Sequence, residues 1–396
     1  MVTLIRGGDV FAPEPIGRKD ILLAGGTIEA VAEPGRIRVD GLEAETVDAA
    51  GKRVFPGLID PHVHILGGGG EGGPATRAPE IRVEDIISSG VTTVIGCLGT
   101  DGVTRHMTSL LAKARALELE GVSTFIYSGS YEIPVRTLTG CVRSDRIVVD
   151  KVVGAGEIAV SDHRSSQPTF DAVAGLAAEC RVGGMLGGKA GVLHFHLGDG
   201  KRRLELLFRL VRETEIPASQ LVPTHINRNP GLFEEGLEWV AGGGSVDITV
   251  GPEPVPPDPE VSLEDCIARF REKGLPFGRI MVSSDSNGSI PVFDESGRLV
   301  RLTIATEKDL FRKFRDVLRK GLLPPETAAR LFSTNAAEFY KLGKKGRIGP
   351  GRDADLVVVD GDLGLSDVFA RGKRMMAGGR LLVRGTFSNL KGGQSP

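Results

Sequence analysis

The sequence predicts an α/β protein: a (β/α)8 TIM-like barrel over residues 56–343, joined to a small β-sandwich domain that combines residues 1–55 and 344–396. Two observations support this prediction. Eight short β-rich segments alternate with helical segments between residues 56 and 343, which is the pattern of parallel strands joined by helices. Both chain ends instead hold short alternating runs separated by Gly and Pro turns. We therefore expect the two ends to form one β domain.

The predicted barrel strands are short, rich in Val, Ile and Leu, and end near polar residues. They are 54–59, 92–98, 123–128, 157–161, 192–196, 221–225, 245–250 and 280–284. The predicted helices are 84–89, 104–120, 170–186, 201–212, 230–241, 262–273, 307–319 and 325–340. The terminal strands are expected at 2–4, 21–23, 28–31, 37–39 and 46–48, and at 355–360, 368–371, 374–376 and 380–383. A doubly wound open sheet is the alternative, but no GxGxxG motif directly follows the first barrel strand, since residues 60–66 contain no glycine.

Composition and charge exclude several classes of protein. The 396 residues carry a formal net charge of −2, so no general attraction to nucleic acid or to a membrane surface is expected. No run of eighteen apolar residues is present, so no transmembrane helix is expected, and the N-terminus is too short and polar for a signal peptide. The four cysteines, Cys97, Cys141, Cys180 and Cys266, show no CxxC spacing. We interpret them as free thiols of a cytoplasmic protein.

The most informative segment is 56–66, PGLIDPHVHIL, in which an apolar strand runs into His62 and His64. Alternate residues of a strand point to the same face, about 6.6 Å apart, so two imidazoles there are able to bind one metal ion. The loop Gly67–Gly73 follows, with Glu71 as its one carboxylate. Because no GK[ST] follows this loop, it is not a phosphate-binding loop. We interpret it as a collar that brings Glu71 to a ligand.

Polar residues at other predicted strands complete a candidate metal site, because chemistry in such barrels lies at the carboxyl ends of the strands. Besides His62 and His64, these residues are Glu157 at the start of the fourth strand, and His196, His225 and Asp285 at the ends of the fifth, sixth and eighth. Imidazole and carboxylate suit zinc and similar divalent ions. Six ligands exceed the need of one ion, so we expect two metals bridged by a carboxylate.

Four further polar residues near these positions are not expected to be ligands. His194 shares a face with His196 but lies one layer deeper, so we interpret it as a core residue or as a support for the ligands. His106 and His163 do not fall at strand ends. Asp60, which precedes the first ligand, is expected to point away from the site.

These motifs resemble those of a known family. The segment 56–64, the barrel inserted into a two-ended β domain, and the phrase GRIGPGRDADL at 346–356 are similar to the amidohydrolase superfamily. The resemblance narrows to the isoaspartyl dipeptidases, which cleave β-aspartyl dipeptides. The segments that carry it are 67–73, Gly129–Tyr131, Ser161–Ser165, Pro223–Arg228 and Ser283–Ser289. It runs along essentially the whole chain, and it implies a metal-dependent dipeptidase that forms a homo-oligomer.

The resemblance implies a role for each matching position. It makes His62, His64 and Asp285 ligands of one zinc ion, and His196 and His225 ligands of a second. In the substrate pocket it implies that Glu71 holds the α-ammonium, Tyr131 polarises the scissile carbonyl, Arg164 and Arg228 bind the carboxylates, and Thr100 and Ser289 add hydrogen bonds. The implied partner is a small β-aspartyl dipeptide, with no nucleic acid and no membrane.

One position departs from the family. Where this chain has Glu157, the family usually has a lysine that is carboxylated and bridges the two metals. Glu157 already carries a carboxylate, so the charge is kept without modification, but its side chain is three bonds shorter and loses roughly 3.5 Å of reach. The backbone of the fourth strand must then lie closer to the metals, or the metals must shift. Two metals bridged by Glu157 is the expectation, and a single-metal site is the alternative.

The chemistry of a β-aspartyl dipeptide fits these residues. The substrate has one ammonium and two carboxylates, which match Glu71 and the planar guanidinium groups of Arg164 and Arg228. A metal-bound water has its pKa lowered toward 7. Asp285 is expected to act as general base and then as general acid, with the Tyr131 hydroxyl stabilising the oxyanion.

Two other functions remain open at this stage. A cyclic-amide hydrolase, such as a hydantoinase or a dihydroorotase, shares the metal ligands but has no use for Glu71 together with two arginines. A barrel that has lost catalysis and acts as an assembly partner has little reason to keep four histidines and Asp285.

Overall fold

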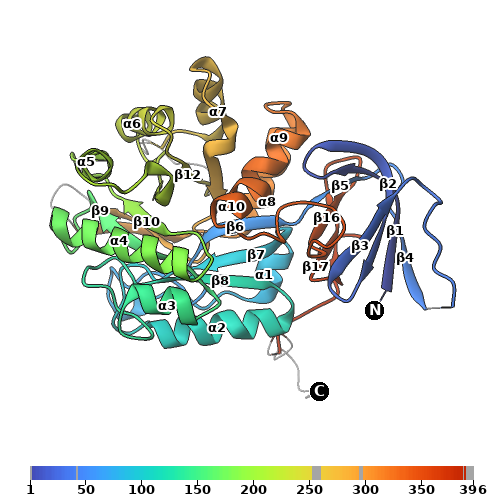
Figure 1. Ribbon diagram of the computed structural model, residues 1–396, viewed down its shortest axis with the longest axis horizontal. Helices are drawn as coiled ribbons and strands as arrows, with labels where there is room; N and C mark the ends of the chain where they lie inside the picture. The colour runs from blue at the N-terminus through green and yellow to red at the C-terminus, as the bar shows by residue number, and fades with distance from the viewer. Residues whose placement is uncertain (1, 42, 252–259, 294–297, 387, 389–396) are drawn as a thin grey trace.

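The predicted fold class is confirmed by the computed structural model, which describes residues 2–41, 43–251, 260–293, 298–386 and 388. A barrel of parallel strands surrounded by helices lies beside a sheet that contains both ends of the chain (Figure 1). Residues 1, 42, 387 and 389–396 of the predicted β domain lie outside the described residues.

The barrel strands follow one another around the barrel in chain order. They are β6 (Leu58–Val63), β7 (Val91–Gly96), β8 (Ser123–Ser128), β9 (Val152–Val160), β10 (Val192–Leu197), β11 (Leu221–Thr224), β12 (Val246–Thr249) and β13 (Ile280–Ser283). β6 to β11 form one sheet, and β12 pairs with β13. A parallel bridge from Val63 to Ser286 joins the end of β13 to β6. The amide of Ile226 donates to the carbonyl of Asp247 at 3.4 Å, which connects the β11 end to β12.

The strands are buried on both faces because helices cover the outside of the barrel. All nine residues of β9 are buried. This strand begins at Val152 rather than at Glu157, so the expectation that Glu157 starts the fourth strand is wrong. Its first half contains small residues, which predict a strand poorly. In the barrel they are required for close packing, because a Cβ on Gly154 would lie 2.8 Å from Cδ1 of Tyr127.

The helices agree with most of the predicted ranges. They are α1 (Val83–Ile87), α2 (Met107–Glu120), α3 (Val142–Val148), α4 (Phe170–Leu186), α5 (Glu205–Glu213), α6 (Pro230–Ala241), α7 (Leu263–Glu272), α8 (Lys308–Arg319), α9 (Pro325–Ala329) and α10 (Asn335–Phe339). The short α3 was not predicted. A π-helical turn at Arg330–Thr334 separates α9 from α10 within the predicted helix 325–340. α6 begins where the Asn229 side chain accepts the Leu232 amide and Pro230 takes the first position, both typical start signals.

The second sheet combines strands from both chain ends. They are β1 (Val2–Phe11), β2 (Pro15–Ala24), β3 (Thr27–Ala32), β4 (Ala44–Asp48), β5 (Arg53–Pro56), β16 (Leu356–Val359), β17 (Leu365–Ala370), β18 (Lys373–Ala377) and β19 (Arg380–Leu381). Their order is β19-β18-β17-β16-β5-β1-β2-β3, and β4 pairs with β1. The two chain ends meet where β5 pairs antiparallel with β16. The predicted strand at 37–39 does not form.

A hairpin that was not predicted follows the last barrel strand. Its strands are β14 (Ser289–Phe293) and β15 (Leu299–Ile304), which pair antiparallel. The hairpin begins four residues after Asp285 and therefore lies at the edge of the barrel that carries the candidate site. None of the helices in the described ranges is long and apolar enough to cross a membrane.

The sheet and the barrel are joined tightly at the β5–β6 connection. Gly57 lies between these strands, and a Cβ there would be 2.2 Å from Oγ1 of Thr92. Beside it, Phe55 of β5 packs edge-on against Phe314 of α8, with ring centroids 5.3 Å apart. Phe314 also packs against Phe332 at 5.4 Å. One buried ring of the barrel layer therefore contacts the terminal sheet.

Replacing Phe314 with alanine is expected to destabilise the protein by about 3–5 kcal/mol, because it leaves a cavity between α8 and β5. The measurement is chemical denaturation monitored by circular dichroism. Leu119→Ala is the matched control, since Leu119 is 90% exposed on α2 and its loss should change stability by less than about 0.5 kcal/mol. Equal midpoints for the two variants would contradict the assigned packing.

Candidate metal centre and substrate pocket

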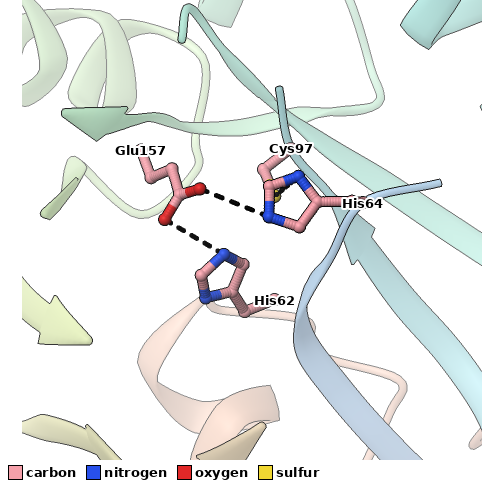
Figure 2. A group of neighbouring side chains, drawn as sticks. All are labelled: His62, His64, Cys97 and Glu157. Carbon is pink, nitrogen blue, oxygen red and sulfur yellow. Dashed lines mark hydrogen bonds and ion pairs between the residues drawn. The ribbon is translucent and has the colours of Figure 1, made fainter. Parts of the chain in front are cut away.

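A first group of candidate ligands lies at the carboxyl ends of β6 and β13 and in the second half of β9. Nε2 of His62 is 3.1 Å from Oε2 of Glu157, and Nε2 of His64 is 3.4 Å from Oε1 of the same carboxylate (Figure 2). Oδ1 of Asp285 is 3.0 Å from Nε2 of His64 and 3.6 Å from Nε2 of His62. Two imidazoles and two carboxylates therefore point toward one common position.

A second group shares Glu157 with the first. Nδ1 of His196, on β10, is 3.2 Å from Oε2 of Glu157. Nε2 of His225, which follows β11, is 3.1 Å from that same His196 nitrogen and 4.0 Å from Oε2 of Glu157. Glu157 is fully buried and is the member common to both groups.

The spacing of these atoms fits bound divalent ions. Two ligands of a tetrahedral zinc ion at 2.0–2.1 Å lie about 3.3 Å apart, and the distances within the first group scatter around this value. Three buried atoms of that group have no hydrogen-bond partner among the described residues, namely Nε2 of His62, Oε1 of Glu157 and Oδ1 of Asp285. Buried polar atoms are normally satisfied, and a cation bound between these three would satisfy them.

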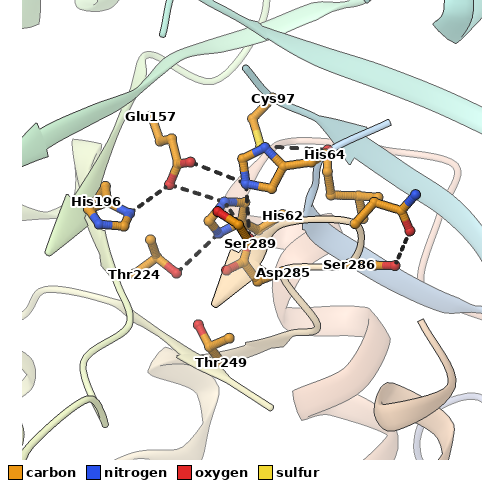
Figure 3. A network of polar contacts seen from close by, with 12 residues as sticks. His62, His64, Cys97, Glu157, His196, Thr224, Thr249, Asp285, Ser286 and Ser289 are labelled. Atoms are coloured by element: carbon orange, nitrogen blue, oxygen red, sulfur yellow. Dashed lines mark hydrogen bonds and ion pairs between the residues drawn. The ribbon is translucent and has the colours of Figure 1, made fainter. Parts of the chain in front are cut away.

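The second nitrogen of each candidate histidine ligand also has a partner, which orients the ring. These contacts join His62 to Thr224 at 3.3 Å (Figure 3), His64 to Cys97 at 3.6 Å, His196 to Asp162 at 3.1 Å and His225 to Thr249 at 2.7 Å. The Thr224 hydroxyl in turn donates to Asp247 at 2.5 Å, across the β11–β12 junction. Because these partners hold the nitrogen that faces away from Glu157, they also fix the orientation of the nitrogen that faces it.

Burial and charge shift the pKa values of the cluster. Burial raises the pKa of Glu157, but the imidazoles of His62 and His196 outweigh this and hold it well below its ordinary value. Burial lowers the pKa of His62, yet the charge of Glu157 raises it well above the usual range. For His225, burial and the neighbouring His196 both act downward, so its pKa is well below the usual range. The site therefore contains an ionised carboxylate, as a cation site requires.

Local backbone geometry turns the ligands inward. His225 and Asp285 follow the ends of β11 and β13 with φ of 60° and 53°, in the left-handed region that non-glycine residues rarely adopt. β9 carries a register irregularity opposite Leu193–Phe195, next to Gly156. A Cβ at Gly156 would lie 2.6 Å from the carbonyl oxygen of His194. This bulge re-aims the strand, and the short side chain of Glu157 reaches both histidine groups.

Glu71 is the centre of the candidate substrate pocket. Its carboxylate accepts hydrogen bonds from the hydroxyls of Thr100 at 3.1 Å and Ser289 at 3.0 Å. It also forms an ion pair with Nη1 of Arg164 at 3.3 Å. The glycine loop and the start of the β14–β15 hairpin therefore meet at Glu71, beside the candidate metal ligands.

Arg164 is held between two carboxylates and an aromatic ring. Asp162 binds its guanidinium through two hydrogen bonds of 3.0 and 2.8 Å, and the guanidinium carbon lies 5.4 Å from the centroid of Tyr131. The Tyr131 hydroxyl is 2.9 Å from Nδ1 of His196. Burial raises the pKa of Tyr131 well above its ordinary value, against the lowering effect of Arg164. The phenol is therefore protonated and is able to donate a hydrogen bond.

The remaining sequence-predicted positions are placed as follows. Arg228 is half-buried beside His225, whose pKa it helps to lower, and its Nε atom has no hydrogen-bond partner among the described residues. His194 is buried beneath the ligands, with its ring stacked on Tyr127 at 4.8 Å. His106 and His163 are exposed and belong to neither ligand group.

Comparison with known proteins identifies the family to which this chain belongs. The amidohydrolase family profile matches residues 233–382. The crystal structure of the β-aspartyl dipeptidase from Fervidobacterium islandicum AW-1 in complex with the dipeptide β-Asp-Leu shares 45% sequence identity with this chain. It covers 96% of this chain and 98% of its own, with a TM-score of 0.88. The chain belongs to the β-aspartyl dipeptidase family of the amidohydrolases. This confirms the resemblance inferred from the motifs, and at the level of the family it confirms a metal-dependent hydrolase.

More distant relatives share less sequence identity with this chain. An adenine deaminase of Halalkalibacterium halodurans is 26% identical over 394 residues, and the match covers 96% of this chain and 58% of the deaminase. This chain thus spans little more than half the length of that relative. A D-hydantoinase structure is 18% identical with a TM-score of 0.70, which shows a common fold.

Several residues of the site were not found from the sequence. Asp162 binds both Arg164 and His196, and Cys97, Thr224 and Thr249 contact the histidine ligands. The rule that located the candidate ligands, namely that chemistry lies at the carboxyl ends of barrel strands, also applies to these four residues. All four lie at, or within two residues of, the carboxyl ends of barrel strands. Thr and Cys at such positions are usually packing residues, so the sequence alone did not distinguish them.

Removing divalent metal with a chelator is expected to lower the Tm of the protein, and added zinc is expected to restore it. A ligand present at 1,000 times its Kd stabilises the folded state by about 4.1 kcal/mol. His62→Ala removes a candidate ligand and should lower the metal content measured by elemental analysis. His106→Ala removes an exposed histidine outside both groups and should leave the metal content unchanged. Equal metal content in the two variants would argue against the assigned centre.

Proposed function

We propose that this protein hydrolyses the isopeptide bond of β-aspartyl dipeptides. The observation that carries the proposal is the Glu71–Arg164 ion pair, 3.3 Å long, beside the buried candidate ligand cluster. A zwitterionic substrate is able to replace such a pair, since its ammonium matches the carboxylate and its carboxylate matches the guanidinium. The related enzyme from Fervidobacterium islandicum AW-1, crystallised with β-Asp-Leu, adds support.

The proposed cofactor is a pair of zinc ions. His62, His64 and Asp285 would hold one, His196 and His225 would hold the other, and Glu157 would bridge them, because its carboxylate is the member that both groups share. Bound metal ions acidify water and polarise a carbonyl group. The buried atoms of His62, Glu157 and Asp285 that lack a hydrogen-bond partner within the described ranges support this assignment.

Substrate recognition is assigned to five side chains. Glu71 would bind the α-ammonium, with Thr100 and Ser289 orienting its carboxylate through the hydrogen bonds that they already donate. Arg164 and Arg228 would bind the two carboxylates. Arg164 is pre-oriented by Asp162, so little conformational freedom is lost when it binds a ligand. The Nε atom of Arg228, which has no hydrogen-bond partner in the described part of the chain, is a donor that a substrate carboxylate would satisfy.

Proton transfer is assigned to Asp285. Its carboxylate would accept the proton of the attacking water and pass it to the leaving amine, as general base and then as general acid. The Tyr131 phenol, whose pKa burial raises, would donate a hydrogen bond to the oxyanion of the tetrahedral intermediate. The homo-oligomeric state and the cytoplasmic location stay predictions from the sequence.

The purified protein is expected to turn over β-Asp-Leu with a kcat/KM roughly 10⁴-fold above that for a hydantoin, because the cyclic amide leaves Glu71 and the arginines unpaired. Glu71→Gln should remove much of this preference by raising KM for the dipeptide. A faster reaction with the hydantoin would favour a cyclic-amide hydrolase. No turnover of either compound, with less than about half a metal ion per chain, would favour the non-catalytic assembly role.

Asp285→Asn is expected to lower kcat by roughly 10²–10⁴-fold, with KM for β-Asp-Leu closer to the wild-type value. The amide keeps the shape of the side chain but cannot accept the proton. Metal content is measured in parallel, because Asp285 is also a candidate ligand. Unchanged turnover in the metal-loaded variant would remove Asp285 from the proton-transfer role.

A further inference from the structure

Two buried carboxyl groups that the proposed mechanism does not use lie behind Asp285. Asp60 on β6 is 0% exposed, and Glu307 at the start of α8 is 1% exposed. Both contact Ser284, the residue before Asp285. Asp60 accepts the backbone amide of Ser284 at 3.1 Å, and Glu307 accepts the Ser284 hydroxyl at 3.3 Å. Asp60 therefore points away from the ligand side chains, as expected from the sequence, but it contacts the backbone that carries them.

Asp285 adopts a backbone conformation that needs support. Its φ of 53° lies in a region that costs free energy for a residue with a side chain, and such residues persist where the surroundings hold them. The residue on its other side is held as well. The amide of Ser286 donates to the Ser284 hydroxyl at 2.9 Å, and the carbonyl of Ser286 accepts the His64 amide at 2.9 Å.

The same contacts connect β6 and β13, which are the first and last strands of the barrel. Besides Ser284, Asp60 accepts the backbone amide of His62 at 3.1 Å. One carboxyl group thus binds the backbone of a histidine ligand on β6 and the backbone next to Asp285, after β13. Among the described residues, these two strands close the barrel through one bridge, from Val63 to Ser286, so side chains supply much of the connection at this seam.

Helix capping does not explain the burial of Glu307. It occupies the N-cap position of α8, where a carboxylate normally accepts an amide of the first helical turn. Its side chain makes no capping hydrogen bond and turns instead to Ser284. Burial first, and then the charge of Asp60, raise the pKa of Glu307 well above its ordinary value. A glutamine is therefore a close substitute in both charge and shape.

We propose that Asp60 and Glu307 are positioning residues for Asp285. They hold Ser284 from two sides, Ser284 holds Ser286, and the carboxylate of Asp285 is thereby fixed within 3.0 Å of Nε2 of His64. The inference deepens the proposed function where it concerns turnover. Its consequence for binding of the first metal ion is independent of the substrate.

The test uses the full-length protein with Glu307→Ala, Glu307→Gln, Ser284→Ala and the double variant. Zinc affinity is measured by competition with a chromophoric chelator, and kcat and KM are measured with β-Asp-Leu. Asp309→Ala is the matched control. It removes a largely buried carboxylate of the same helix whose hydrogen bonds come from Thr306 and Arg312, away from Ser284.

Glu307→Ala and Ser284→Ala are each expected to weaken the first zinc site and to lower kcat by roughly 10–100-fold, with KM little changed and the second zinc site unaffected. Glu307→Gln should stay near wild type. The double variant should be no worse than Ser284→Ala, because that single variant already lacks the contact with Glu307 and the acceptor of the Ser286 amide. Asp309→Ala should match wild type in zinc affinity and kcat.

Wild-type zinc affinity and kcat in Glu307→Ala and Ser284→Ala would overturn the inference. Equal losses of zinc affinity and kcat in Glu307→Ala and Glu307→Gln would also overturn it. Glutamine can still accept the Ser284 hydrogen bond, so it should preserve both quantities if that bond positions Asp285. If Glu307→Ala does not fold, the smaller change Ser284→Ala decides. If wild-type protein does not hydrolyse β-Asp-Leu, the proposed function fails, and the zinc competition still tests the positioning of Asp285.

Discussion

The rest of the candidate site depends on one buried carboxylate, that of Glu157, among the imidazoles of His62, His64 and His196. An ionised group without exposure to water is costly unless positive charge compensates it. Neutral imidazoles do not carry that charge. Burial of this carboxylate is therefore favourable only when protons or metal ions bind to the cluster. Binding of a cation thus follows from the way in which the fold buries Glu157. The bulge at Gly156 makes the contact geometrically possible, because it brings a short side chain to three strands at once.

Charge is distributed differently in the adjoining pocket. There Glu71 and Arg164 neutralise each other at the rim, and Asp162 connects Arg164 to the histidine cluster. The candidate metal ligands and the candidate substrate-binding residues therefore form one continuous hydrogen-bonded network. A zwitterionic ligand is able to enter by exchanging partners with Glu71 and Arg164, without leaving either charge unpaired. The Glu71 loop and the Ser289 hairpin contribute to this pocket from opposite ends of the barrel sequence.

Much of the fold and most of the candidate ligands were predictable. The strand at 123–128 and the helices at 170–186 and 230–241 were located at their observed bounds, because their hydrophobic runs are flanked by clear start and stop signals. The predictions failed where the local signal is weak. The first half of β9 contains Gly and Ala, α3 is seven residues long, and the β14–β15 hairpin contacts the distant loop of Glu71 through Ser289. In these segments tertiary packing, rather than local propensity, selects the conformation.

The sequence by itself determined the class of fold, the edge of the barrel at which the chemistry lies, and the chemical types of the ligands, since periodicity and residue type are local properties. Only the tertiary structure decided which carboxylate is shared, how far Glu157 reaches, and which side chains orient each ligand. It also revealed Asp60 and Glu307 behind Asp285. Contacts of this kind join residues that are 23 to 224 positions apart in the chain. Their distances depend on how the barrel closes, which no local pattern encodes.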